Sequence, residues 1–197
     1  MRLIFATNNT HKTEEIRALL PNDFSVITIK EAGIVGDIPE PHDTLQDNAA
    51  EKARTIYALT HCNCFSDDTG LEVYALNNEP GVHSARYAGE GRSFAKNIDK
   101  LLQKMENLND RSARFRAVIC LILDGKEHYF EGICQGKILK ERRGMEGFGY
   151  DSVFIPDGSD KTFAEMSMEE KNVFSHRGKA VAALVAYLKQ LHIKDIN

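Results

Sequence analysis

The feature that most constrains the fold is a pair of long strand patterns separated by a short turn. The patterns cover residues 113–123 and 127–139, and both are dominated by residues that favour strands. Asp124-Gly125 lies between them, and this dipeptide is a strong signal for a tight hairpin turn. The pattern therefore predicts two long antiparallel strands.

Shorter strands alternate with helices in the rest of the chain. Strands are predicted over 2–6, 24–29 and 153–155. Helices are predicted over 13–20, from Asp43 or Thr44 to about 60, over 93–108, from Ser167, and from Ser175 onwards. Such a succession is typical of an α/β fold with a mixed sheet flanked by helices. The chain has 197 residues, 42% of them hydrophobic, which favours one domain spanning 1–197.

Two adjacent carboxylates, Asp67 and Asp68, stand between two apolar runs. A strand ending near Phe65 and another over 71–76 predict that the Asp-Asp-Thr-Gly segment is a turn between them. Adjacent carboxylates repel each other, and a bound cation or a raised pKa relieves that repulsion. The pair can therefore serve as a metal ligand or as a base for water. An ordinary polar turn is the alternative, because Asp and Gly favour turns.

A polar loop over residues 7–12 connects the first predicted strand to the first helix. Backbone N–H groups and the helix dipole make such a junction a ready anion site. Asn8 and Asn9 add amide donors there, and Lys12 adds a charge. The loop lacks the glycines and the Lys-Ser/Thr pair of a Walker loop. A surface loop with an Asn cap and a solvated lysine is the alternative.

Three further positions are candidates for ligand contacts. Glu40, just ahead of the second helix, either reaches a metal or complements the helix dipole. The glycine-rich segment 142–151 carries two aromatic residues that we expect to be exposed, and a flat ligand can lie against Phe148. His176 and Arg177 begin the last helix, where cations oppose the dipole unless an anion or polar ligand offsets the cost. A solvated His-Arg pair is the alternative.

Charge and composition exclude several classes of protein. The net charge is −4 without a block of one sign, so a broad basic face for nucleic acid is not indicated. No apolar run approaches the ~18 residues of a membrane span, and residues 1–7 do not resemble a signal peptide. We expect the four cysteines to be buried, reduced thiols of a cytoplasmic protein: Cys62, Cys64, Cys120 and Cys134.

Five motifs resemble, in order and spacing, those of the inosine triphosphate pyrophosphatase family, the non-standard purine NTP pyrophosphatases. They are Thr7-Asn8-Asn9-x-x-Lys12, Asp67-Asp68-Thr69-Gly70-Leu71, the segment 80–87, Gly147-Phe148-Gly149-Tyr150-Asp151 and Ser175-His176-Arg177-Gly178. The match runs nearly end to end. Thr69 stands where the family more often has serine, and we expect this change to be nearly neutral.

The resemblance implies hydrolysis of ITP, dITP and XTP to the monophosphate and pyrophosphate, with Mg²⁺ as cofactor. It also implies a homodimer and an elongated mixed sheet with two lobes around a central nucleotide-binding cleft. Neither nucleic acid nor a membrane is an expected partner.

The resemblance also implies roles for individual residues. Asp68 would be the catalytic base, a metal ligand, or both, and Glu40 the second metal ligand, although its Pro39-Glu40-Pro41 context departs from the common pattern. Phe148 would stack on the purine, and His176 or Arg177 would donate to its 6-keto oxygen. The implied substrate contacts are Thr7, Asn8, Asn9, Thr10, His11, Lys12, Thr69, Phe148, Gly149, Tyr150, Asp151, Lys171, His176 and Arg177.

Two alternatives remain open at the level of the sequence. One is a Maf-like pyrophosphatase that acts on other modified nucleotides. The other is a non-catalytic nucleotide-binding protein, in which the pair of aspartates would have no catalytic function.

Overall fold

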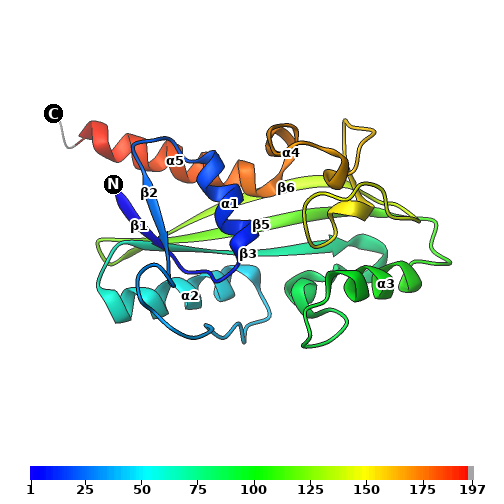
Figure 1. The fold of residues 1–197 in the computed structure, drawn as a ribbon, viewed down its shortest axis with the longest axis horizontal. Helices are drawn as coiled ribbons and strands as arrows, with labels where there is room; N and C mark the ends of the chain where they lie inside the picture. Colours follow the sequence, from blue (N-terminus) through cyan, green and yellow to red (C-terminus); the bar gives the residue numbers. More distant parts are fainter. Residues whose placement is uncertain (195–197) are drawn as a thin grey trace. The chain divides into compact units, whose positions relative to one another are not determined.

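The computed structural model describes residues 1–194, and Figure 1 shows the order of its elements. The strands are β1 Arg2–Phe5, β2 Ser25–Thr28, β3 Cys64–Val73, β4 Glu79–Pro80, β5 Ser112–Leu123, β6 Lys126–Ile138 and β7 Phe154–Pro156. The α-helices are α1 Thr10–Leu19, α2 Leu45–Thr60, α3 Phe94–Lys104, α4 Met168–Phe174 and α5 His176–Lys194. Short 3₁₀ turns cover η1 Tyr74–Leu76, η2 Gly81–Arg86, η3 Asp151–Val153 and η4 Phe163–Glu165.

The strands form a mixed sheet in the order β2-β1-β3-β5-β6-β7, and β4 pairs with β3. β1 is parallel to β2 and to β3, whereas β4 and β7 are antiparallel to their neighbours. The α/β fold with a mixed sheet and flanking helices, predicted from the sequence, is thereby confirmed.

The predicted hairpin between β5 and β6 is present. Its two turn residues, Asp124 and Gly125, have φ angles of 50° and 78°. Positive φ at both positions is the requirement of a type I′ turn, whose twist matches that of the flanking strands. The Asp-Gly signal therefore identified this turn correctly.

The chain divides into two compact units, and β3, β5 and β6 contribute residues to both. The first unit comprises residues 1–68, 117–132 and 177 onwards, and the second comprises 69–116 and 133–176. Each unit has its own hydrophobic core and is described separately below.

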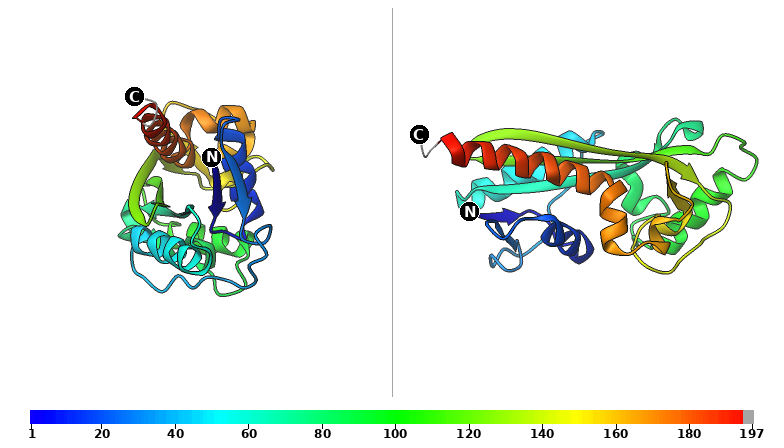
Figure 2. Two further views of the ribbon diagram at one scale, coloured as in Figure 1. Left: turned by 90° about the vertical axis from the view of Figure 1, so that its left-hand side faces the viewer. Right: turned by 90° about the horizontal axis from the view of Figure 1, so that it is seen from above.

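In the first unit, helices cover both faces of the sheet (Figures 1 and 2). Ile16 of α1 and Leu184 of α5 belong to one buried cluster with Phe5 and Phe65. Ala53 and Ile56 of α2 belong to a second cluster with Ile4 and Cys64. Consecutive strand residues thus alternate between the α1/α5 face and the α2 face, as the period of two in a strand requires.

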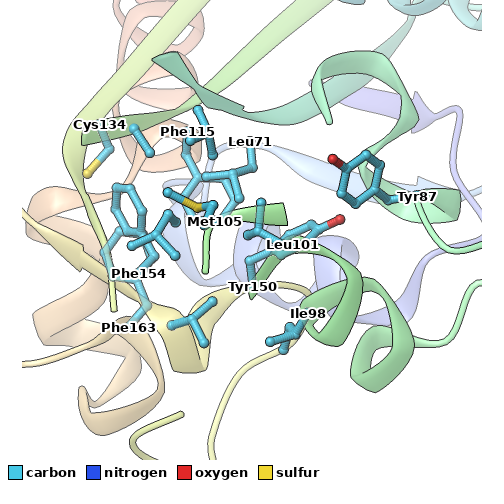
Figure 3. Close-up of a cluster of buried hydrophobic side chains, with 14 of the residues drawn as sticks. Leu71, Tyr87, Ile98, Leu101, Met105, Phe115, Cys134, Tyr150, Phe154 and Phe163 are labelled. Carbon is cyan, nitrogen blue, oxygen red and sulfur yellow. The ribbon is translucent and has the colours of Figure 1, made fainter. Parts of the chain in front are cut away.

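The core of the second unit packs aromatic rings between its strands and α3 (Figure 3). Phe115 of β5 contacts Phe154 edge to face, with 4.7 Å between ring centroids. Leu101 of α3 and Met105, which follows the helix, are fully buried in the same cluster. Ser93 caps this helix by accepting a hydrogen bond from the Lys96 amide, as the sequence predicted.

The prediction of a turn at Asp-Asp-Thr-Gly is wrong. β3 runs without interruption from Cys64 to Val73, and Asp67 and Asp68 are buried within it. Extended backbone is retained because both carboxylates find cationic partners on neighbouring helices. Gly70 serves close packing: a Cβ there would lie 2.5 Å from the carbonyl oxygen of Gly81. Tertiary packing therefore overrides the local turn preference of these residues.

Two smaller expectations are also corrected. Tyr150 is buried rather than exposed, because its ring packs in the hydrophobic cluster of the second unit, where its hydroxyl donates to the Ser84 carbonyl oxygen at 2.8 Å. All four cysteines are free, as expected, but Cys62 is exposed, since it follows the end of α2 in a surface turn. Within residues 1–194, none of the helices combines the length and apolar character that crossing a membrane requires.

Candidate functional site

The alternation of β3 sends its two adjacent carboxylates to opposite faces of the sheet. Asp67 shares the α1/α5 face with Phe65, two residues before it. Asp68 shares the α2 face with Ser66, whose hydroxyl donates to the Ala49 carbonyl oxygen of α2. We call these the Asp67 face and the Asp68 face. The two carboxylates therefore need not share one counterion, as their adjacency in the sequence suggested.

On the Asp67 face, two carboxylates meet two cations. Lys12 of α1 contacts Asp67 at 2.9 Å, and the Arg177 guanidinium contacts it at 3.3 Å. Glu15 of α1 also accepts a hydrogen bond from Arg177. Burial by itself would raise the pKa of Asp67, but Lys12, Arg177 and Lys52 lower it well below its usual range. Asp67 is therefore held as an anion and is a poor candidate for accepting a proton.

On the Asp68 face, Glu40, Lys52 and Asp68 form a triad. The Lys52 ammonium group lies 2.6 Å from Glu40 and 3.2 Å from Asp68. When all three are ionised, the triad carries one net negative charge. Burial raises the pKa of Asp68; Lys52 and Lys12 oppose the rise, and Glu40 and Asp67 add to it. Asp68 is therefore the better proton acceptor of the two aspartates.

Two members of the triad, Glu40 and Asp68, are the residues that would hold a hard divalent cation. Two carboxylates that contact the same ammonium group converge on one point, and oxygen ligands are those that Mg²⁺ prefers. The net negative charge of the triad favours a further cation beside it. Glu40 and Asp68 would hold this ion together with water and substrate phosphates, as is usual for magnesium in phosphate-transferring sites.

The loop between β1 and α1 is organised by its own side chains. Asn9 caps α1 by accepting a hydrogen bond from the Lys12 amide at 3.2 Å, and Thr7 accepts from the Asn9 amide at 3.1 Å. Asn8 donates to the Gly36 carbonyl oxygen at 3.1 Å. The loop follows β1, which is parallel to both of its neighbours, and such carboxyl ends are where open α/β sheets bind ligands. A helix N-terminus in this place, with the Lys12 charge beside it, is the kind of position where proteins bind anions.

In the second unit, Asp151 organises the glycine-rich segment. Its Oδ2 accepts from the Phe148 amide at 2.9 Å and from the Lys171 ammonium group at 2.7 Å. The same ammonium group lies 5.2 Å from the centre of the Phe148 ring. Gly147 has φ of +77°, and a Cβ there would lie 2.2 Å from Asp151 Oδ2. Only glycine allows this segment to close on the carboxylate, and Phe148 is held half-buried as a result.

His176 and Arg177 are both buried, so they are not a solvated pair. The imidazole of His176 stacks on Phe115 at 4.8 Å in the second unit. The guanidinium of Arg177 is held by Asp67 and Glu15 in the first unit. Adjacent residues of one motif thus belong to different units.

The structure sorts the candidate residues into two groups, one in each unit. Ion pairs tie Lys12 and Arg177 to Asp67, and Glu40 and Asp68 to Lys52, whereas Asn8 is directed to the loop at Gly36. The first unit holds Thr7, Asn8, Asn9, Thr10, His11, Lys12, Glu40, Asp68 and Arg177. The second unit holds Thr69, Phe148, Gly149, Tyr150, Asp151, Lys171 and His176.

Two charged residues of the site were missed from the sequence. Lys52 lies on the buried stripe of α2, one turn after Ala49 and one turn before Ile56. Glu15 lies three residues after Lys12, on the buried side of α1. A charged residue inside an apolar helical stripe was the available signal in both helices, because such a residue is rarely buried without a partner.

A mixed α/β sheet with a helix N-terminus at the end of a parallel strand and a converging pair of carboxylates is an arrangement suited to a phosphate-handling class of protein. Comparison with known proteins identifies the family within that class. The model of the Ham1 family matches residues 3–187, and the chain belongs to this family. The resemblance found in the sequence motifs is thereby confirmed.

Several relatives match over nearly their whole length. The dITP/XTP pyrophosphatase of Porphyromonas gingivalis is 51% identical over 95% of this chain and 97% of that protein. The dITP/XTP pyrophosphatase of Flavobacterium johnsoniae is 47% identical, over 95% of this chain and 98% of that protein. Among solved structures, a HAM1 protein from Coxiella burnetii is 37% identical with a TM-score of 0.89, covering 96% of this chain and 99% of that one.

Proposed function

We propose that this chain hydrolyses ITP, dITP and XTP to the corresponding monophosphate and pyrophosphate, and so removes non-standard purine nucleotides from the nucleotide pool. The observation that carries the proposal is the arrangement of two adjacent carboxylates: Asp67 is paired with Lys12 and Arg177, whereas Asp68 shares the Lys52 ammonium group with Glu40. The relatives at 47% and 51% identity, which are named dITP/XTP pyrophosphatases, supply the substrate class.

The residues of the first unit bind the triphosphate and act on water. Lys12 and the N-terminus of α1 attract the phosphates. Asp68 orients a water molecule and accepts its proton as the water attacks the α-phosphorus, which breaks the bond to the pyrophosphate leaving group. Mg²⁺ held by Glu40 and Asp68 would supply charge neutralisation for the phosphates.

The residues of the second unit bind the purine. Phe148 offers its ring for stacking, and Asp151 with Lys171 fixes the segment that carries it. His176 supplies a donor to the 6-keto oxygen of inosine and xanthosine. Adenine presents an amine instead, and leaving buried donors unsatisfied costs ~1–3 kcal/mol for each group.

The proposal treats residues 1–197 as one pyrophosphatase domain, in which both units serve one activity. We also propose that the protein is a homodimer, as the resemblance implied, and sedimentation of the purified protein would test this. The proposal also includes a cytoplasmic location, which is supported by four cysteines that are all free thiols.

The deciding experiment measures pyrophosphate release from ITP, dITP, XTP and ATP, with and without Mg²⁺. We expect release from the first three only, and only with the metal. Adding dUTP and dTTP separates this function from that of a Maf-like enzyme, which would prefer other modified nucleotides. Tight ITP binding without release of pyrophosphate in the presence of Mg²⁺ would instead identify a non-catalytic binding protein.

A further inference from the structure

Phe94 is an exposed aromatic residue beside the glycine-rich segment. It is the first residue of α3, its side chain is 40% exposed, and its ring lies 6.1 Å from the Phe148 ring at an angle of 46°. Because Ser93 caps the helix directly before it, the position of Phe94 is fixed by the start of α3. Two aromatic rings held side by side at a fixed position are suited to contact with a flat ligand.

The glycine-rich segment is anchored to the same helix turn. Arg142 donates to the Ala95 carbonyl oxygen at 2.9 Å and to the Asp99 carboxylate at 2.8 Å. At the other end of the segment, Asp151 accepts from the Phe148 amide. The two rings are therefore held beside each other by contacts on both sides of Phe148.

We propose that Phe94 is a specificity-determining residue that contacts the purine ring together with Phe148. The inference rests on the proposed function and extends it to a residue outside all five motifs. A purine has two fused rings and can contact two aromatic side chains whose centroids are 6.1 Å apart, whereas the single ring of a pyrimidine reaches only one. Phe94 thus favours purines as a class and does not distinguish ITP from XTP.

The first test is kinetic. Phe94→Ala raises the KM for ITP and for XTP by about tenfold, within the range of one lost base–aromatic contact, and leaves kcat within about threefold. Phe94→Tyr keeps the wild-type KM, because it retains the ring. Phe94→Leu separates stacking from packing: it keeps an apolar contact with Phe148, and the proposal expects its KM to stay raised.

The second test uses the absence of tryptophan from the chain. In Phe94→Trp the new indole is the sole tryptophan, and saturating IMP quenches its fluorescence by stacking, whereas UMP quenches it less and pyrophosphate leaves it unchanged. Tyr129→Trp, on the exposed part of β6 in the first unit, is the matched control and shows no quenching by IMP.

The outcomes separate this inference from the proposed function. An unchanged KM in Phe94→Ala, a wild-type KM in Phe94→Leu, or no quenching in a Phe94→Trp variant that still hydrolyses ITP would each overturn the role of Phe94 while the function stands. A wild-type protein that releases no pyrophosphate from ITP would overturn the proposed function itself.

Discussion

The Asp67 face and the Asp68 face of the first unit place the same chemical group in two environments. On the Asp67 face, Lys12 and Arg177 hold the carboxylate ionised. On the Asp68 face, one ammonium group serves both Glu40 and Asp68, and burial raises the pKa of Asp68. The comparison teaches that the side of the sheet, rather than position in the motif, determines which charged partners each aspartate has.

The comparison is tested most strongly by removing the proton acceptor. Asp68→Asn keeps the shape of the side chain but cannot accept a proton, so we expect pyrophosphate release from ITP to fall by at least ~100-fold, the lower end for a general base. Initial rates at saturating ITP and Mg²⁺ measure the effect. Activity within about threefold of wild type would move the catalytic role to another residue.

The matched change on the other face should act on stability. Asp67→Asn leaves the buried Arg177 and the half-buried Lys12 with one counterion fewer, and breaking a buried pair costs about 3–5 kcal/mol. Urea unfolding monitored by circular dichroism measures the loss. Asp68→Asn is the control, because Lys52 keeps Glu40 as a partner, and we expect a loss of about 1 kcal/mol there. Equal losses of unfolding free energy in the two variants would show that the two faces do not differ in their contribution to stability.

A smaller effect tests the metal site of the Asp68 face. Lys52→Met leaves Glu40 and Asp68 without their shared ammonium group, so a divalent cation should bind the pair more tightly. At a Mg²⁺ concentration about ten times Kd, binding would stabilise the variant by about 1.4 kcal/mol. Thermal unfolding with and without Mg²⁺ measures this, with Lys100→Met as a control on α3. A shift no larger than that of the control would argue against Glu40 and Asp68 as ligands.

Much of the fold was predictable because its signals are local. The Asp124-Gly125 turn and the caps at Thr44, Ser93 and Ser167 each depend on residues within one turn, and each is present. The continuity of β3 was not predictable in this way. Local preference favoured a turn, whereas the partners that keep Asp67 in a strand are 55 residues away at Lys12 and 110 residues away at Arg177.

The site shows the same limit. The sequence motif contains Asp67 and Asp68 side by side. That their side chains point to opposite faces of the sheet follows only once the segment is known to be a strand. Lys52 lies on a helix 16 residues before Asp68, and the sequence gives its place on the buried stripe of α2 but not its partner. Phe94 could not be identified as a neighbour of Phe148, since nothing local relates two residues so far apart in the sequence.

The smallest predicted effect concerns Thr69, the residue that follows the two aspartates in β3. Thr69→Ser keeps the hydroxyl and loses one methyl group from a half-buried position, so we expect kcat/KM for ITP to stay within about twofold of wild type. Thr69→Ala then isolates the hydroxyl. Unchanged kinetics in the alanine variant would show that the hydroxyl takes no part in the reaction, whereas a loss in alanine that serine restores would show that it does.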